Sequence, residues 1–339
     1  MKLSGVPEPY IDFAPSDYIC HKTSKELILD GNLQKEFWED APWSEEFVDI
    51  EGDIKPKPHK STRFKMLWDD EYLYFGAQLE EDEIWATLTE RDSVIFHDND
   101  FEIFIDPDGD THNYYEFEIN ALNTIWDLFL PEPYRDNGKP VNSWDIRGIK
   151  SAIHIQGELN NPEAHNLSWS VEVAMPWKVL RECAFESRKP KHGEYWRVNF
   201  SRVQWKTEVK DGKYRKLINP ETDVPYAEDN WVWSPTGLIN MHYPELWGFV
   251  VFSEQGDIDF EIPEEEIIKW QLRKLYYRQR NYYEKHGSFS GDFEELSQGD
   301  SFTIKPNIEI TSSMFQISTL SKDKKYRICI RQDGKVWRE

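Results

Sequence analysis

The chain has few cysteines and no long apolar run, and these absences exclude several classes of protein. Its 339 residues include only three cysteines, Cys20, Cys183 and Cys329, which lie far apart. Neither a disulfide framework nor a CxxC metal site is indicated, and buried free thiols are expected. No apolar stretch approaches the roughly 20 residues that a membrane helix needs, so membrane insertion is not expected.

Basic charge is also scarce. Forty Lys and Arg stand against 63 Asp and Glu, which gives a formal net charge of −23. Nucleic acids and anionic membranes are recognised by basic patches, so neither is an expected partner. The deficit is uneven, because residues 263–339 hold 14 basic and 12 acidic side chains whereas residues 1–262 hold 26 and 51. The balance of acidic and basic side chains therefore changes near Pro263.

Recognisable leader and catalytic motifs are missing as well. The first residues contain no apolar segment typical of a secretory signal peptide, although a mature protein given a new Met would look the same. The chain contains no GxSxG, HExxH, Walker or GxGxxG motif. The sequence thus favours binding over catalysis.

Short alternating segments with turn signals between them are abundant, and they predict a mainly β protein. Many short strands with few helices favour an antiparallel β-sandwich. Short helical pieces are expected at residues 33–39 and after Pro176. The expected strands span residues 26–29, 63–68, 72–80, 101–106, 114–120, 124–130, 150–156, 168–174, 196–205 and 247–252. A tight hairpin turn is expected at residues 69–71, between the second and third of these strands.

Both ends of the chain differ from this pattern. Residues 1–20 contain three prolines and predict an extended lead-in before a sandwich at residues 21–256. In residues 257–339, Pro263 and the three glutamates after it suit a helix N-terminus, and Gly287 suits its end. A second, short helix is expected after Asp292, followed by strands at residues 308–310, 314–320, 326–330 and 335–337. We expect a small α+β subdomain with an antiparallel sheet.

The segment from Asn99 to Leu128 encodes a hairpin with a polar face. Side chains alternate with period two, so the apolar residues of each strand share one face. The opposite face collects polar residues: Glu102, Asp106, Glu116, Glu118 and Asn120. This face is either simply solvated or a polar binding site.

Six segments carry a family resemblance. They are residues 27–43, 65–79, 99–110, 169–177, 196–205 and 231–252, in that order. On these segments the chain resembles carbohydrate-binding module family 9 domains, which are β-sandwiches of the immunoglobulin-like and DOMON type. The resemblance implies an oligosaccharide or polysaccharide partner, a part in polysaccharide recognition or breakdown, and an extracellular or periplasmic location.

The sequence departs from the family at the sugar site. In sugar-binding members, two Trp side chains clamp a sugar ring and an Arg in the second hairpin strand hydrogen-bonds it. The matching positions here are Phe96, Met241 and Glu118. The family's clamp is therefore not reproduced, and other residues would have to bind a ligand.

Aromatic and polar side chains gather near the hairpin and along later strands. Rings at strand ends can stack on a sugar while carboxylate, amide and Arg groups read its hydroxyls, although core or loop packing would use the same residues. The candidate carbohydrate-binding residues are Phe96, Glu102, Glu118, Asn120, Trp126, Trp144, Arg147, Arg202, Trp205, Trp231, Trp233, His242 and Glu245.

The loop between the hairpin strands is a candidate metal site. Asp106, Asp108 and Asp110 are spaced so that their oxygens can converge on a hard cation such as calcium. The resemblance also implies calcium, because family members hold it structurally. The alternative is a hairpin turn that uses Asp and Gly for their turn geometry. Haem, which DOMON relatives bind, is not expected, since no His and Met spacing supports it.

Three functions follow from these observations. The favoured one is non-catalytic carbohydrate binding. The second is a polysaccharide-active hydrolase that uses surface carboxylates, whose spacing the sequence does not reveal. The third is an interaction scaffold in which the C-terminal subdomain docks a protein partner.

Overall fold

The computed structural model describes residues 4–339, and it confirms a mainly β fold with a small C-terminal α+β unit. The larger strands are β1 (Asp17–Lys22), β3 (Thr62–Trp68), β4 (Tyr72–Glu80), β5 (Asp100–Asp106), β6 (Tyr114–Asn120), β7 (Ile125–Leu130), β8 (Lys150–Gln156), β9 (Ser168–Pro176), β10 (Tyr195–Gln204) and β16 (Gly248–Ser253). The short ones are β2 (Val48–Asp49), β11 (Thr207–Lys210), β12 (Lys213–Lys216), β13 (Ile218–Asn219), β14 (Val224–Pro225) and β15 (Asp229–Val232). The C-terminal strands are β17 (Asn307–Ile310), β18 (Phe315–Leu320), β19 (Arg327–Arg331) and β20 (Val336–Arg338).

Helices are few. The α-helices are α1 (Trp177–Leu180), α2 (Glu264–His286) and α3 (Phe293–Ser297). Single turns of 3₁₀-helix are η1 (Glu36–Trp38), η2 (Gly52–Ile54), η3 (Ile95–His97), η4 (Tyr134–Asp136), η5 (Arg181–Cys183), η6 (Phe185–Ser187) and η7 (Pro244–Leu246). Among the described residues, no helix is both long and apolar enough to cross a bilayer.

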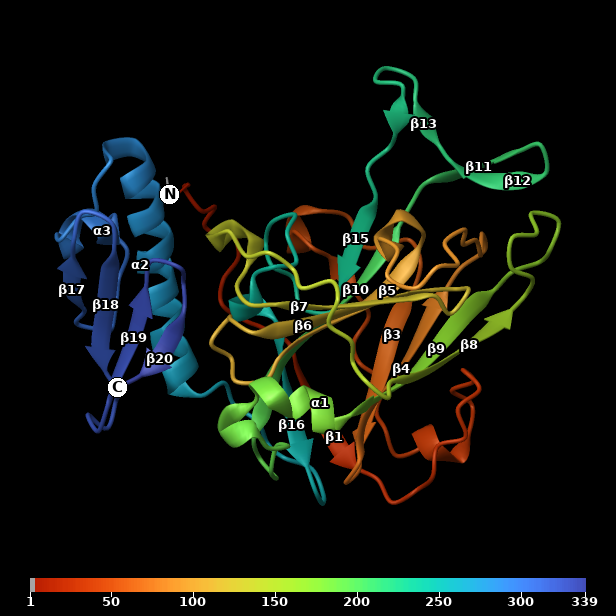
Figure 1. Ribbon diagram of the computed structural model, residues 1–339, viewed down its shortest axis with the longest axis horizontal. Helices are drawn as coiled ribbons and strands as arrows, with labels where there is room; N and C mark the ends of the chain where they lie inside the picture. Colours follow the sequence, from red (N-terminus) through yellow and green to blue (C-terminus); the bar gives the residue numbers. More distant parts are fainter. Residues whose placement is uncertain (1–3) are drawn as a thin grey trace.

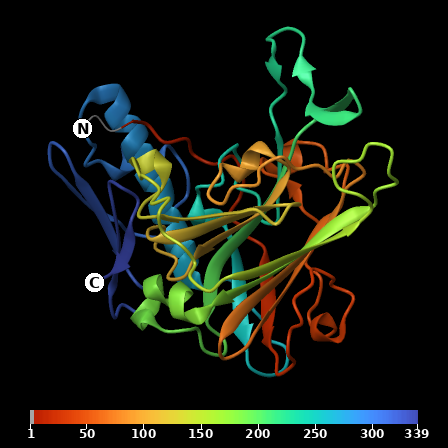
Figure 2. The ribbon, with the colours of Figure 1, turned by 45° about the vertical axis from the view of Figure 1, so that its right-hand side comes forward.

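One large curled sheet forms the main body. Its strand order is β7-β6-β5-β10-β16-β1-β3-β4-β9-β8, with β15 and β2 joined beside β10. The two halves of the sheet enclose the core (Figures 1 and 2). The turn predicted between β3 and β4 forms as expected, because the Asp69 carboxylate accepts hydrogen bonds from the N–H groups of Glu71 and Tyr72, each at 2.7 Å.

The central strand β1 differs from the predicted all-antiparallel pairing. It runs parallel to both β16 and β3, and it begins inside residues 1–20, the segment expected to be an extended lead-in. The strand predicted at residues 26–29 is wrong, since this segment has no strand pairing. Tyr18 and Cys20 point into the core, so burial between two neighbours stabilises β1 in spite of the prolines before it.

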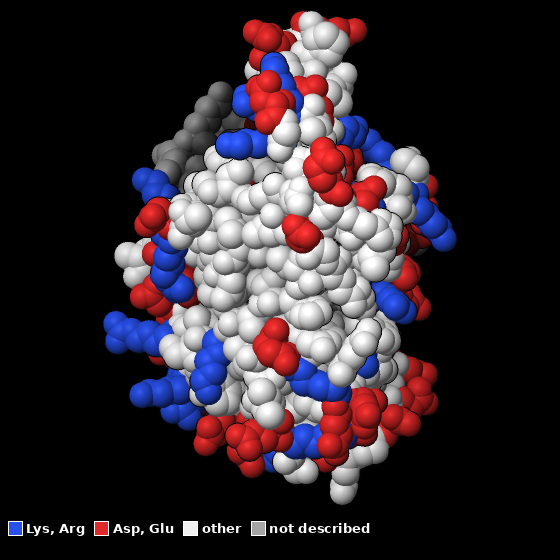
Figure 3. All heavy atoms as spheres, turned by 90° about the vertical axis from the view of Figure 1, so that its right-hand side faces the viewer, with Lys and Arg blue, Asp and Glu red and all other residues white. Residues whose placement is uncertain are grey.

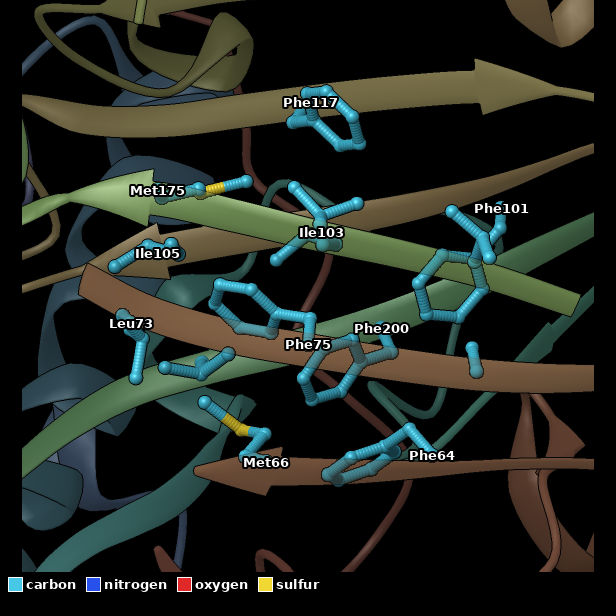
Figure 4. Packing of buried hydrophobic residues seen from close by; sticks show 14 of the residues in the cluster. Phe64, Met66, Leu73, Phe75, Phe101, Ile103, Ile105, Phe117, Met175 and Phe200 are labelled. Carbon is cyan, nitrogen blue, oxygen red and sulfur yellow. The ribbon is translucent and has the colours of Figure 1, made fainter. Parts of the chain in front are cut away.

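Aromatic and aliphatic side chains fill the space between the two halves of the sheet (Figure 4). The Phe200 ring from β10 lies with its centroid 3.9 Å from that of Phe64 and 5.9 Å from that of Phe101. These rings come from the strand faces that alternation assigned to the core. The inward alternation predicted for the hairpin is therefore confirmed.

The C-terminal unit consists of α2, α3 and a four-stranded antiparallel sheet. Pro263 precedes the first turn of α2, and Gly287 ends the helix with a left-handed φ of 71°, as predicted. Helix α2 lies between the small sheet and the main body (Figure 1). The N-terminal segment packs against the same unit, because Phe13 stacks on Trp270 at a centroid distance of 5.2 Å.

The cysteines are largely as the sequence predicts, whereas one short helix is shorter than predicted. All three cysteines are free, and Cys20 and Cys329 are buried as expected while Cys183 is half-buried. The helix predicted at residues 33–39 shortens to the single turn η1, because Trp38 and Phe37 are held by packing in a small side core rather than by an amphipathic stripe.

Candidate functional site

The polar face of the β5–β6 hairpin is covered by other parts of the chain. We call residues 88–98 and 241–247 the cover segments, because their apolar side chains pack on this face through Phe104 and Tyr114. The backbone N–H of Phe96 donates to Glu118 at 2.9 Å, and the side-chain amide of Asn120 donates to the carbonyl of Leu88 at 2.9 Å. The face is therefore not a solvated surface, which corrects the first of the two interpretations.

Four acidic side chains are buried under the cover segments. Glu102 and Glu118 stand opposite each other in the strand register, with exposed fractions of 5% and 1%. Asp100 and Glu116 lie beside them and are also buried. One oxygen from each of Asp100, Glu102 and Glu118 lies within 4.8 Å of the other two. The hairpin thus concentrates negative charge in a closed space.

Burial and mutual repulsion perturb these carboxyl groups. Burial raises the pKa of Glu102 to about 7. Burial, and next the charge of Glu102, raise the pKa values of Asp100 and Glu118 well above the usual range. Burial therefore disfavours the ionised form of all three groups unless something compensates their charge.

These shifts predict that stability depends on pH. Between about pH 4.5 and about pH 7, the folded state binds more protons at Glu102 than the unfolded state, so the free energy of unfolding falls as pH rises. The charged groups that interact with Glu102 are Asp100, Glu116, Glu118 and Glu228. Urea denaturation in the presence of a chelator should show that Glu102→Gln flattens this fall. An equally steep fall in the variant would contradict the assignment.

The aromatic candidates near this face lie too deep for stacking on a ligand in this conformation. Trp126 is buried, with its ring centroid 6.5 Å from that of the half-buried Phe96. Met241, at the position of the family's second Trp, is buried against the same cluster. Trp205 is half-buried and its indole N–H donates to the carbonyl of Phe96 at 2.8 Å. No sugar clamp is formed by these residues.

Several other candidates serve packing within the main body. Trp231 and Trp233 belong to the core. The Arg202 guanidinium donates to Glu81 at 2.9 Å and is buried. Trp144 stacks on Tyr115 at a centroid distance of 4.8 Å, whereas Arg147 is exposed in a loop. The number of aromatic residues in the sequence does not tell which of them pack in the core and which could contact a ligand.

His242 and Glu245 lie at the contact with helix α2. The Arg135 guanidinium donates to Glu245 at 2.9 Å, and the Tyr277 hydroxyl from α2 donates to the same carboxylate. His242 pairs with the Tyr114 hydroxyl at 2.8 Å, and burial, with the nearby charge of Arg135, lowers its pKa to about 3. A neutral, half-buried imidazole and a paired carboxylate fit a structural contact between the two units.

The acidic loop at the hairpin end contacts the C-terminal unit. Asp106 accepts hydrogen bonds from the N–H groups of Gly109 and Thr111, at 3.0 and 2.8 Å. Asp110 forms an ion pair with Lys335 at 2.9 Å. One oxygen from each of Asp106, Asp108 and Asp110 lies within 4.8 Å of the other two, so the loop brings together the predicted metal ligands.

A cavity of about 570 Å³ opens beside this loop. Its walls come from three places: the acidic loop, the segment from Ala184 to Arg197, and β20 with the start of α2. Phe185, Tyr195 and Trp337 supply rings to it, and Phe185 is 64% exposed. Sequence reasoning found only Asp108 and Asp110 of this cavity, because its walls come from segments distant in sequence.

A smaller polar groove lies on the outer face of β3, β4, β9 and β8. It has a volume of about 310 Å³ and includes Trp43, Arg63, Gln78, Gln156 and Ser170. The alternation of polar residues on neighbouring strands could have revealed it, because these positions share the face opposite the core. Figure 3 shows that the side of the molecule to the right of Figure 1 carries a broad area with few charged residues, with most of the charges around its rim.

Comparisons with known proteins agree with the architecture. Residues 28–193 match the model of the family described as carbohydrate family 9 binding domain-like. A putative carbohydrate-binding protein from Bacteroides uniformis is 17% identical with a TM-score of 0.50, and the alignment covers 71% of this chain and 100% of that one. The similarity supports a shared fold.

Two further structures are of a carbohydrate binding module family 9 from Caldicellulosiruptor kristjanssonii. The complex with cellotriose is 15% identical with a TM-score of 0.45, over 73% of this chain and 99% of that one. The complex with glucose is 16% identical with a TM-score of 0.44, over 72% and 100%. None of the curated proteins compared with the chain matches it.

Proposed function

We propose that this protein, whose residues 28–193 match the carbohydrate family 9 binding domain-like model, binds an uncharged oligosaccharide or polysaccharide chain in the cavity beside the acidic loop. The observation that carries this proposal is the set of rings in one cavity that also holds many polar groups. Aromatic rings stack on the C–H faces of sugars, and polar groups at the rim bind the hydroxyls.

The charges of the cavity favour an uncharged ligand. Its walls hold four acidic and four basic side chains, in a chain whose net charge is −23. Arg188 pairs with Glu194 at 2.6 Å, and Arg338 pairs with Glu265 at 2.8 Å. Side chains in ion pairs can still form hydrogen bonds with sugar hydroxyls. Because the acidic and basic side chains of the cavity balance, it has no excess charge that would attract an ionic ligand.

The C-terminal unit takes part in the proposed site. Trp337 and Arg338 come from β20, and Glu265 comes from α2. We therefore assign this unit to ligand binding in preference to docking of a protein partner. Calcium held by Asp106, Asp108 and Asp110 would stiffen the opposite wall, since it favours carboxylate oxygens.

Export to the periplasm or cell exterior and a part in polysaccharide breakdown complete the proposal. The family resemblance implies both the location and the part in breakdown. An extracellular polysaccharide as the ligand is consistent with both. The hydrolase alternative predicts product release from the same glycans, which chromatography of the reaction mixture would detect.

Isothermal titration against a panel of neutral oligosaccharides tests the site. Phe185→Ala and Trp337→Ala are each expected to weaken binding about tenfold, or about 1.4 kcal/mol, because each removes one stacking ring. Trp43→Ala, in the separate polar groove, is the matched control and should leave affinity unchanged.

Two results would contradict the proposal. Absence of heat with every sugar in the panel would argue against carbohydrate binding as such. Loss of affinity in Trp43→Ala, with Phe185→Ala and Trp337→Ala unaffected, would move the site to the outer groove of β3, β4, β9 and β8.

A further inference from the structure

The three carboxylates under the cover segments lack a partner that offsets the burial of their charge. Asp100 and Glu102 share one face of β5, and Glu118 stands opposite Glu102 on β6. Their exposed fractions are 0%, 5% and 1%. Burying an ionised carboxylate is costly unless it is paired, hydrogen-bonded or bound to a metal. Their surroundings therefore have to supply one of these.

Basic side chains do not pair with these carboxylates. Within residues 4–339, no Lys, Arg or His nitrogen lies within 4.0 Å of an oxygen of these three carboxylates or of Glu116. The nearby charged groups are mostly acidic as well, since Asp98, Glu116 and Glu228 add to the repulsion. Lys216 approaches from β12, but its ammonium group lies 3.2 Å from the centroid of the Trp205 ring.

Hydrogen bonds supply little of this compensation, since the Val203 backbone near Asp100 and the Ser201 hydroxyl near Glu102 favour the ionised forms less than burial disfavours them. Both carboxylate oxygens of Asp100 are buried, and neither has a hydrogen-bond partner among the described residues. Glu118 accepts one bond, from the N–H of Phe96 at 2.9 Å. Buried polar groups are nearly always satisfied, so an unpartnered carboxylate aimed at two others indicates a missing partner.

We propose that Asp100, Glu102 and Glu118 bind a divalent cation of the calcium or magnesium class. All the donors are carboxylate oxygens, which these hard cations prefer. Two ligands of one calcium ion, each at about 2.4 Å, are at most about 4.8 Å apart. The observed convergence within 4.8 Å meets this limit.

This site is separate from the acidic loop. Asp100 and Asp106 stand at opposite ends of β5, about 20 Å apart at the usual rise per residue. It is also separate from the proposed carbohydrate cavity, whose lining residues include none of the three. A cation here would join β5, β6 and the cover segments into one rigid body.

Terbium luminescence and calorimetry of the full chain test the proposal. Trp126 faces Glu118 across the β6–β7 register, so it is placed to sensitise a terbium ion bound at Glu118. After removal of metal with a chelator, we expect saturable terbium emission that calcium competes away. Calcium should also raise the melting temperature of the wild-type chain.

Matched variants locate the ion. Asp100→Asn and Glu118→Gln should each weaken cation binding at least tenfold, whereas Asp40→Asn, on the exposed surface and outside both acidic clusters, should keep the emission and the thermal shift. Trp126→Phe should lose the emission but keep the thermal shift. This variant removes the sensitising indole without changing the three carboxylates.

Other outcomes overturn the proposal. A stripped wild-type chain that shows neither emission nor a thermal shift would mean that protons neutralise the carboxylates. Loss of both signals in Asp108→Asn alone would mean that the ion is bound in the acidic loop. Unchanged affinity in Asp100→Asn and Glu118→Gln would exclude these ligands.

Discussion

Replacing Asp136 with alanine is expected to lower the free energy of unfolding by about 3 to 5 kcal/mol, because it leaves a buried guanidinium without its partner. Asp136 is 6% exposed and lies where the main body meets helix α2. The Tyr276 hydroxyl donates to it at 2.6 Å, and Arg280, which is fully buried, donates to the same oxygen. Breaking one partner of a buried pair costs far more than breaking a surface pair.

Urea denaturation followed by tryptophan fluorescence measures this effect. Asp40→Ala is the control, since Asp40 pairs with Lys25 at 2.7 Å in an exposed position, and it should change the midpoint much less. Asp136→Asn should fall between the two, because it removes the charge but can still accept from Tyr276. A loss of less than about 1 kcal/mol in Asp136→Ala would mean that the contact between the units contributes little to stability.

The second large effect is expected in the core between the two halves of the sheet. Phe200→Ala should lower the free energy of unfolding by about 3 to 5 kcal/mol, through lost burial and the cavity left behind. The Phe200 ring is fully buried and touches rings from β3, β4 and β5, as Figure 4 shows for Phe64, Phe75 and Phe101.

Phe185→Ala is the matched control for the same measurement. Its ring is 64% exposed, so its removal should change stability by no more than about 0.5 kcal/mol. A similar loss in both variants would show that the ring contacts of Phe200 are not what stabilises the core. The same protein samples also serve the sugar-binding titrations, which separates stability from ligand contact.

Local sequence pattern was sufficient wherever side-chain alternation or helix ends decide the structure. The hairpin faces of β5 and β6, the turn at Asp69 and the ends of α2 at Pro263 and Gly287 were predicted because each depends on residues close together in sequence. Strand β1 was not predicted, because its parallel neighbours lie about 45 and 230 residues away in the chain.

The candidate site was harder to predict for the same reason. Alternation assigns Glu102 and Glu118 to the face away from the core, but it says nothing about what covers that face. The cover segments have no regular period, so their packing was not visible in the sequence. Likewise, Trp231 in the core and Trp337 in the cavity are chemically identical, and only the tertiary structure separates their roles.

The position of β1 has a consequence for how the chain is made. During synthesis the N-terminus emerges first, yet one edge of β1 meets its partner only when residues 248–253 have been made. Until then Tyr18 and Cys20 lack half of their enclosure, and the exposed edge of β1 is open to wrong pairing. The main sheet therefore closes only after residues 248–253 have left the ribosome, and contacts so distant in sequence form slowly.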